Sequence, residues 1–378
     1  MARPAGEIRP TVSRRVVLVT PYALSVYGGV QEQVLAMSRE LARRDWSVEI
    51  VAPDSRDHAT YDTPSTVHRV GRLTSLRANG SRAPVTLSPS ASRRAAALIR
   101  RVRPSVTHFH EPFAPLLGWS ALREHVAPSV GTFHRGGAGP ATRWTGPVQR
   151  HLARHLDVVV AVSASAAATM GAASGLAPEV LFNGFELDRF TTVARHVPDS
   201  VTIGVVGRLE ERKGVATAIR AVRRHNERST TRWRLSVVGE GPERDRLATL
   251  AKGDPSIEFL GALDDVAKRS WMRACSVIVT PALRGESFGL VLLEAMASEV
   301  PLVASDIDGY REAAGGCAIL VAPGDADALE RGIDAALSAP PSQLAAARSH
   351  AAQWSMARLV DEYETRYDVA RHRYDRAR

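Results

Sequence analysis

The sequence predicts an α/β protein built from two Rossmann-like, doubly wound domains that face each other across a cleft. Short apolar runs rich in valine alternate with amphipathic stretches, which is typical of buried parallel strands and their crossover helices. This series occurs twice, and 378 residues suffice for two or three domains. The hydrophobic share of 44% and the charged share of 24% are those of an ordinary globular protein.

The first series of expected strands lies in residues 1–190. Its apolar runs are Val16–Val19, Val48–Ala52, Val106–Phe109, Val130–Phe133 and Val158–Val162. The segment Val158–Pro178 carries no charge over 21 residues and is long enough to span a bilayer. Because it splits into a β-branched run and an Ala/Ser/Gly-rich stretch capped by Ser163, we interpret it as a strand and a helix of a globular domain.

The second series lies in residues 201–353, after a pause near Arg189–Ser200 that marks the seam between the domains. Its apolar runs are Val201–Val206, Leu235–Val238, Val277–Thr280, Pro301–Ala304 and Ala318–Val321. We therefore expect an N-terminal domain at 1–190, with residues 1–13 flexible, and a C-terminal domain at 201–353. Large apolar residues at near-helical spacing then predict a long terminal helix over 354–378.

The charge distribution argues against a nucleic-acid partner. The formal net charge of +9 is a nucleic-acid signal when it is spread over a domain. Here the whole excess lies in residues 1–190, whereas residues 191–378 hold 26 basic and 26 acidic side chains. The first half is therefore expected to meet an anionic partner or surface.

Cysteine content and the N-terminus indicate where the protein works. Cys275 and Cys317 are too few for a disulfide framework or a zinc cage, which favours a reducing, cytosolic environment. The first residues lack the apolar stretch of a signal peptide.

Two motifs of the second half carry chemistry. Arg208 and Lys213 lie on a loop between a predicted strand and a predicted helix, where both cations can reach one pyrophosphate. The same loop is equally compatible with a solvated basic turn. Farther along, Glu286 precedes a predicted helix and Glu294 lies one and a half turns into it, an arrangement that suits a ligand across a helix N-terminus.

Weaker signals of the sequence remain open. Gly28 and Gly29 follow the first strand, where glycines let backbone N–H groups approach an anion, although a plain tight turn is the slightly favoured explanation when they are taken alone. The stretch around Gly239 is a partial dinucleotide fingerprint that lacks its third glycine, so an NAD enzyme is a remote alternative. His108 and His110 share one strand face without an evident third metal ligand.

The two strong motifs together resemble the nucleotide-sugar domain of retaining glycosyltransferases of family 4, which have the GT-B fold. The family pattern is an Arg/Lys pair followed by two glutamates eight residues apart, and the chain matches it with Arg208/Lys213 and Glu286/Glu294. The resemblance extends over nearly the whole chain and is greatest to the actinobacterial phosphatidylinositol mannosyltransferases and their paralogues. It implies that the terminal helix returns to the N-terminal domain.

The resemblance also implies roles for residues of this chain. Arg208 and Lys213 would bind the donor pyrophosphate, Glu294 the ribose, and Glu286 the transferred sugar beside the Phe288–Gly289 backbone. Gly28 and Gly29 would contact the phosphates or the acceptor, and Leu263 would lie in the loop at the base edge. His134, which follows a strand, would act near the donor sugar and acceptor, and His110 and Glu111 are assigned to the acceptor side.

The reaction implied is a front-face displacement that retains anomeric configuration and needs no protein nucleophile. GDP-mannose is the leading donor by resemblance alone, and neither UDP-glucose nor UDP-N-acetylglucosamine is excluded. No cofactor is expected. Asp306 and Asp308 spell a metal–diphosphate motif of another glycosyltransferase architecture, but family members carry similar residues at this place without metal, so no metal is expected.

A basic helix points to the acceptor. Pro89 suits a helix start, and the following segment presents basic residues beside an apolar edge of Leu98, Ile99 and Val102. The basic residues are Arg93, Arg94, Arg100, Arg101 and Arg103. We expect contact with anionic lipid, and therefore a peripheral enzyme at the cytoplasmic face of the plasma membrane. The alternatives are the same chemistry on a soluble acceptor and a non-catalytic protein that binds a sugar nucleotide or a lipid.

Overall fold

The computed structural model describes residues 14–26, 28–54, 61–78, 81–114, 116–134, 140–191, 200–286 and 288–378. The chain divides into two compact units. The first contains 1–161, 167–179 and 360–378, and the second contains 162–166 and 180–359. Residues 1–13 and most of the predicted seam, 192–199, lie outside the described residues.

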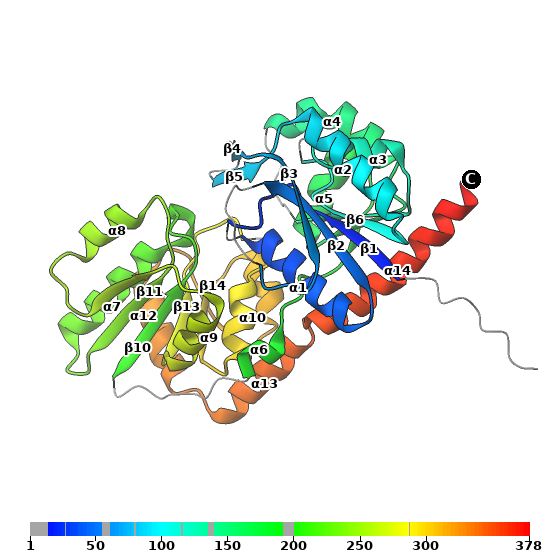
Figure 1. Ribbon diagram of the computed structural model, residues 1–378. Helices are drawn as coiled ribbons and strands as arrows, with labels where there is room; N and C mark the ends of the chain where they lie inside the picture. Colours follow the sequence, from blue (N-terminus) through cyan, green and yellow to red (C-terminus); the bar gives the residue numbers. More distant parts are fainter. Residues whose placement is uncertain are drawn as a thin grey trace, which may run out of the picture. The chain divides into compact units, whose positions relative to one another are not determined.

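The first unit is organised around a seven-stranded sheet with the order β3-β2-β1-β6-β7-β8-β9 (Figure 1). Its strands are β1 (Arg15–Val19), β2 (Ser47–Asp54), β3 (Thr66–Arg72), β6 (Val106–His110), β7 (Ser129–Phe133), β8 (Val158–Ala161) and β9 (Glu179–Val180). Strand β1 pairs in parallel with both β2 and β6, so the chain changes direction across the sheet at this point. A separate hairpin joins β4 (Thr74–Ala78) to β5 (Ser81–Val85).

The helices of this unit complete the strand–helix alternation. They are α1 (Gly29–Arg43), α2 (Pro89–Val102), α3 (Trp119–Glu124), α4 (Pro140–Ala153), α5 (Ala164–Ser174) and α14 (Met356–Arg376). Helices α2, α3 and α4 lie together in Figure 1. The uncharged segment at 158–178 forms β8 and α5, with the Ser163 hydroxyl accepting from the Ala166 amide at 3.2 Å, as predicted. In the described parts of the chain, no helix is long and apolar enough to cross a membrane.

The second unit holds an all-parallel sheet of six strands in the order β12-β11-β10-β13-β14-β15. The strands are β10 (Val201–Val206), β11 (Trp233–Val238), β12 (Ile257–Gly261), β13 (Val277–Thr280), β14 (Leu302–Ser305) and β15 (Ile319–Val321). The helices are α6 (Leu187–Thr191), η1 (Glu211–Lys213), α7 (Val215–Arg228), α8 (Arg244–Ala251), α9 (Asp265–Ala274), α10 (Leu290–Ala297), α11 (Asp308–Ala314), α12 (Ala326–Leu337) and α13 (Pro341–Ala352). This is the Rossmann order, and the prediction of two doubly wound domains is confirmed.

The division of the chain differs from the expected ranges at residues 162–166 and 180–190, which belong to the second unit. Phe185 and Phe190 are buried in the core of that unit beside Phe288, so apolar packing draws the second of these segments across the expected boundary. Helix α14 begins at Met356, and its residues from Val360 onward belong to the first unit, in agreement with the return of the terminal helix that the resemblance implies.

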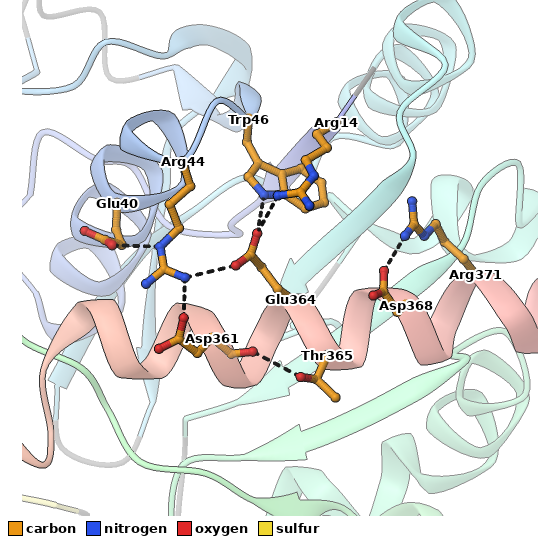
Figure 2. A network of polar contacts seen from close by, with 9 residues as sticks. All are labelled: Arg14, Glu40, Arg44, Trp46, Asp361, Glu364, Thr365, Asp368 and Arg371. Carbon is orange, nitrogen blue, oxygen red and sulfur yellow. Dashed lines mark hydrogen bonds and ion pairs between the residues drawn. The ribbon is translucent and has the colours of Figure 1, made fainter. Parts of the chain in front are cut away.

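Polar contacts fix α14 in the first unit (Figure 2). The guanidinium of Arg44 donates to Glu364 at 2.9 Å and to Glu40 at 2.8 Å, and the indole N–H of Trp46 donates to Glu364 at 2.8 Å. Burial lowers the pKa of Arg44, but hydrogen bonds to the carboxylates of Asp361, Glu40 and Glu364 outweigh it and raise the pKa above its ordinary value. The last helix is thus held to the end of α1 by charge as well as by apolar packing.

Candidate active site

The candidate donor site occupies the switch point of the second sheet. Strand β10 has β11 on one side and β13 on the other, and ligands of doubly wound sheets bind at such a point, beyond the carboxyl ends of the strands. The loop after β10 carries Arg208 and Lys213, and the loop after β13 carries Glu286. The two sequence motifs are therefore brought together by adjacent strands.

The structure places these charges in contact. The Lys213 ammonium lies 2.7 Å from Glu286 Oε1. Arg208 is exposed, and its Nε lies 3.0 Å from Glu210 Oε1. Both predicted cations thus stand at one loop edge, each balanced by a carboxylate that an anionic ligand can replace.

A third cation, Arg212, was missed by the sequence reasoning. Its guanidinium donates to Glu286 at 2.6 Å and to Glu210 at 2.8 Å, so it bridges the two carboxylates. The loop edge therefore holds three cations and two carboxylates. Only the position of Arg212 one residue before Lys213 signalled it, and an arginine in an arginine-rich chain is a weak signal.

Backbone contacts hold the two loops against each other. The Leu283 amide donates to the Arg212 carbonyl at 2.7 Å. Gly214 has φ +66° at the start of α7, and a Cβ there would lie 1.9 Å from the Pro281 carbonyl oxygen. Only glycine permits this approach, so the sequence Lys213-Gly214 fixes both the cation and the loop that presents it.

Glu294 lies one and a half turns into α10 and is buried against a residue that the sequence reasoning also missed. Lys268 of α9 donates to its Oε1 at 3.0 Å, and both side chains are close to fully buried. A buried carboxylate with a buried cation holds a fixed orientation, which suits a group that accepts hydrogen bonds from hydroxyls. Lysine is rare in this chain, and Lys213 and Lys268 are two of its three lysines.

The remaining donor-side residues surround the start of α10 and the end of β12. Gly289 caps α10 in the left-handed region with φ +86°. Phe288 is 1% exposed and packs on Trp354 at 4.9 Å between ring centroids, so its side chain belongs to the core of the second unit. Leu263 is partly exposed in the loop between β12 and α9, just beyond the carboxyl end of β12.

The predicted residues of the first unit gather at its own switch point, between β1 and β6. Gly28 and Gly29 form the N-terminus of α1 after β1, Glu111 follows β6, and His134 follows β7. Glu111 has φ +50°, a conformation that costs energy in a residue other than glycine. Its carboxylate accepts from the His134 amide at 2.7 Å, which fixes the backbone at the end of β7.

His110, which is expected on the acceptor side, lies in a buried position next to His134. The side chain is 1% exposed, and its Nδ1 lies 3.0 Å from His134 Nε2. Burial lowers the pKa of His110 well below its usual range. His110 therefore contacts His134 and not the solvent from which an acceptor arrives.

The basic helix α2 is confirmed as a helix, but its apolar edge is not available to lipid. Ile99 and Val102 are buried in the core of the first unit. The side chains of Arg93, Arg94, Arg100, Arg101 and Arg103 are exposed, although Arg100 pairs with Glu124 of α3. Leu98, the third residue of the predicted apolar edge, is partly exposed, so the solvent-facing surface of α2 is mainly cationic and most of the apolar edge packs on the core.

The two metal patterns of the sequence have protein partners. Arg311 donates to Asp306 and, at 2.9 Å, to Asp308, and it lowers the pKa of Asp306. Both ring nitrogens of His108 are hydrogen-bonded to side chains of the first unit. Within the described ranges, no group of three His, Cys, Asp or Glu residues is arranged to hold a metal ion.

Comparison with known proteins identifies the family. A family model described as "Glycosyltransferase Family 4" matches residues 27–189, and one described as "Glycosyl transferases group 1" matches residues 200–339. The chain is 34% identical over 326 residues to a phosphatidyl-myo-inositol mannosyltransferase of Mycobacterium leprae, covering 83% of this chain and 85% of that protein. The enzyme of the same name from Mycolicibacterium smegmatis is 33% identical, with 93% and 94% covered.

The fold agrees with that of solved glycosyltransferases. A glycosyltransferase from Rickettsia africae superposes with a TM-score of 0.75 at 16% identity, covering 95% of this chain and 99% of that one. The chain therefore belongs to the family 4 (group 1) glycosyltransferases and has the GT-B fold. Its relatives in that family include the actinobacterial phosphatidyl-myo-inositol mannosyltransferases.

Proposed function

We propose that this protein transfers mannose from GDP-mannose to a phosphatidylinositol-type lipid, with retention of anomeric configuration and without a metal. The observation that carries the proposal is the meeting of Lys213, Arg212 and Glu286 at the switch point of the second sheet. Two features support the finer choices of sugar and acceptor. These are the names of the relatives and the exposed arginines of α2.

The donor-side residues have separate roles in this proposal. Arg208 and Lys213 bind the diphosphate, and Lys213 exchanges its contact with Glu286 for a phosphate oxygen. Arg212 stays on Glu286, so the carboxylate keeps a cation while it receives the hydroxyls of the sugar. Glu294 holds the ribose hydroxyls, and the backbone at Phe288–Gly289 lies beside the sugar at the start of α10.

The chemical step is a front-face displacement. The acceptor hydroxyl attacks the anomeric carbon from the side that the diphosphate leaves. The new C–O bond forms as the bond to the phosphate oxygen breaks, and the hydroxyl proton passes to that departing oxygen. The protein stabilises the negative charge on the leaving diphosphate through Arg208 and Lys213.

On the acceptor side, His134 contacts the acceptor or the transferred sugar near Gly28 and Gly29. The arginines of α2 hold the enzyme at an anionic membrane surface, with each basic residue contributing about 1 kcal/mol near anionic lipid. In this proposal the enzyme works peripherally at the cytoplasmic face of the plasma membrane.

A second candidate is the same reaction on a soluble acceptor. The burial of Ile99 and Val102 favours it, because α2 then lacks the apolar side that inserts into a bilayer.

The experiment that tests the proposal is a donor panel. GDP-mannose, UDP-glucose and UDP-N-acetylglucosamine are each incubated with the protein, and released nucleoside diphosphate is measured with and without phosphatidylinositol vesicles. We expect release from GDP-mannose that depends on the vesicles. Release that is equally fast on a soluble acceptor supports the second candidate, and release from no donor contradicts both.

A further inference from the structure

A column of buried polar side chains runs along one face of the first sheet toward His134. His108 Nδ1 lies 2.8 Å from the Tyr367 hydroxyl, and His108 Nε2 lies 2.7 Å from the Thr132 hydroxyl. The Tyr363 hydroxyl completes the group at 2.8 Å from Thr132. Both tyrosines come from α14, so the last helix of the chain supports the strands that lead to the candidate acceptor side.

His110 joins this column to His134. His108 and His110 are two residues apart on β6 and therefore share a face of the sheet, and their rings stack with centroids 4.4 Å apart. The rings of His110 and His134 also stack, at 5.3 Å, and the hydrogen bond of 3.0 Å runs between His110 Nδ1 and His134 Nε2. The Nε2 atom of His110 is buried and has no hydrogen-bond partner in the part of the chain that the structure describes.

This geometry decides which nitrogen carries the shared proton. If His134 Nε2 donated, a neutral His110 would accept through Nδ1 and would carry its own proton on Nε2. That N–H would be buried without an acceptor among the described residues, which costs about 1–3 kcal/mol. If His110 Nδ1 donates, the group left unpartnered at Nε2 is a lone pair, and buried polar groups without a partner are less often N–H donors than acceptors.

A charged His110, with protons on both ring nitrogens, is also unfavourable. A doubly protonated ring would bring a positive charge into a fully buried position beside two further imidazoles. Burial and these neighbours both lower the pKa of His110. His110 is therefore neutral, with its proton on Nδ1.

We propose that His110 is a positioning residue that fixes His134 in the tautomer protonated at Nδ1. Tyr367 contributes by locking His108, whose ring holds the ring of His110 by stacking. Where the inference meets catalysis it rests on the proposed function: the Nε2 lone pair of His134 is then occupied by the N–H of His110, so His134 does not serve there as a general base through Nε2.

The tautomer can be read without any activity. Protein labelled with ¹⁵N-histidine gives two-bond correlations between ring protons and ring nitrogens, and these distinguish Nδ1–H from Nε2–H rings. Comparison with His134→Gln identifies the signals of His134. We expect wild-type His134 to be protonated at Nδ1 at neutral pH, whereas an Nε2–H ring or a charged ring overturns the proposal.

A matched pair of variants tests the cause. Asparagine at position 110 keeps an N–H donor at the place of Nδ1, and leucine has nearly the same shape without the donor. We expect His110→Asn to keep the Nδ1–H form of His134 and His110→Leu to lose it. An unchanged His134 tautomer in His110→Leu contradicts the role of His110, and the wild-type spectrum decides the tautomer even if that variant does not fold.

Activity is the separate arm of the test. We expect kcat of His110→Leu to fall at least about tenfold with the donor KM unchanged, and His110→Asn to recover most of that loss. Tyr367→Phe is expected to lower kcat about threefold and to mix the His134 tautomers. A Tyr367→Phe protein with the wild-type spectrum and rate contradicts the part assigned to α14. Absence of transfer with every donor would refute the proposed function and leave the tautomer result standing.

Discussion

Buried histidine determines how the first unit responds to acid. Burial lowers the pKa of His108 from its ordinary value of 6.5 to about 3. Between these two values the unfolded chain binds a proton that the folded protein does not. The free energy of unfolding therefore falls as the pH drops below 6.5, and the loss due to His108 is complete near pH 3.

This shift predicts a pH dependence of stability. For His108 alone the free energy of unfolding changes by up to about 1.4 kcal/mol per pH unit within that window. We expect His108→Gln to be less stable than the wild type at about pH 7 but to lose stability less steeply between about pH 6.5 and pH 4. Urea unfolding at a series of pH values measures both slopes. Parallel curves for the two proteins would show that His108 does not titrate as the structure indicates.

The buried ion pair of Lys268 and Glu294 predicts how single substitutions change the free energy of unfolding. Removing one partner of a buried ion pair leaves an uncompensated charge, so Lys268→Met is expected to destabilise the protein by about 3–5 kcal/mol. The double variant Lys268→Met/Glu294→Gln removes that charge and is expected to recover most of the loss. The free energy of unfolding of the wild type, the two single variants Lys268→Met and Glu294→Gln and the double variant is measured by chemical denaturation. If the loss in the double variant equals the sum of the losses in the single variants, the two side chains are not coupled.

Sequence reasoning found some of these residues and missed others for a physical reason. Arg208, Lys213, Glu286 and Glu294 fall in motifs whose spacing predicts convergence on a ligand. Arg212 and Lys268 have no such spacing, because their partners are fixed by the approach of loops and helices distant in sequence. A charge on a loop or a helix looks solvated until the fold supplies the opposite charge.

At the scale of elements, the start of α10 depends on Gly289. Its φ of +86° is unfavourable for other residues, and a Cβ would lie 2.6 Å from the Tyr310 ring. We expect Gly289→Ala to destabilise the second unit and to weaken donor binding, since the helix N-terminus moves with it. Gly253→Ala is the control, because Gly253 has φ +82° with open space around its Cβ position.

The comparison of these two glycine variants separates clash from strain. Backbone strain alone is worth about 1–2 kcal/mol and is common to both. Thermal unfolding should therefore show a clearly larger loss for Gly289→Ala, with donor affinity changed only in that variant. Equal losses and unchanged donor affinity in both would mean that the start of α10 tolerates a side chain.

Helix α2 shows what periodicity leaves undecided. Its helical spacing was predicted, yet the pattern of Leu98, Ile99 and Val102 is the same for a helix that packs on a core and for one that lies on a membrane. Burial of Ile99 and Val102 settles this in favour of the core. Leu98 stays partly exposed, so any affinity of α2 for lipid is expected to be mainly electrostatic.

That conclusion gives a vesicle prediction. We expect Arg93→Gln/Arg94→Gln to bind anionic vesicles about 30-fold more weakly than the wild type at low salt, from about 1 kcal/mol per basic residue. The control Arg228→Gln/Arg234→Gln removes the same charge from exposed positions of the second unit. Cosedimentation at two salt concentrations measures both, and equal losses would show that net charge matters and the α2 surface does not.

At the scale of the whole molecule, the sequence predicted the number and type of domains because valine-rich strands and their crossover helices recur in two series. The exact division was less accessible. Residues 180–191 pack by apolar contacts on the second unit, which the local rhythm of the chain does not reveal. Residues 360–378 belong to the first unit although they follow the second in sequence, and this return was expected from the family resemblance and not from the rhythm.

The net charge of the chain and the cations assigned to the donor lie in different halves of the sequence. The excess of +9 lies in residues 1–190, whereas the cations assigned to the donor lie in the balanced half of the chain. Net charge therefore bears on the surface at which the protein works, and local geometry bears on its chemistry.

The most direct test of the account is donor affinity in Lys213→Ala, with Lys252→Ala as the matched control. Lys213 lies 2.7 Å from Glu286 at the switch point, and Lys252 is an exposed residue at the end of α8. Calorimetric titration with GDP-mannose and the rate of GDP release are measured on both proteins. We predict a loss of about 100-fold in turnover and weaker donor binding for Lys213→Ala, with Lys252→Ala unchanged. A Lys213→Ala protein with full donor affinity and full turnover would contradict the assignment of this site.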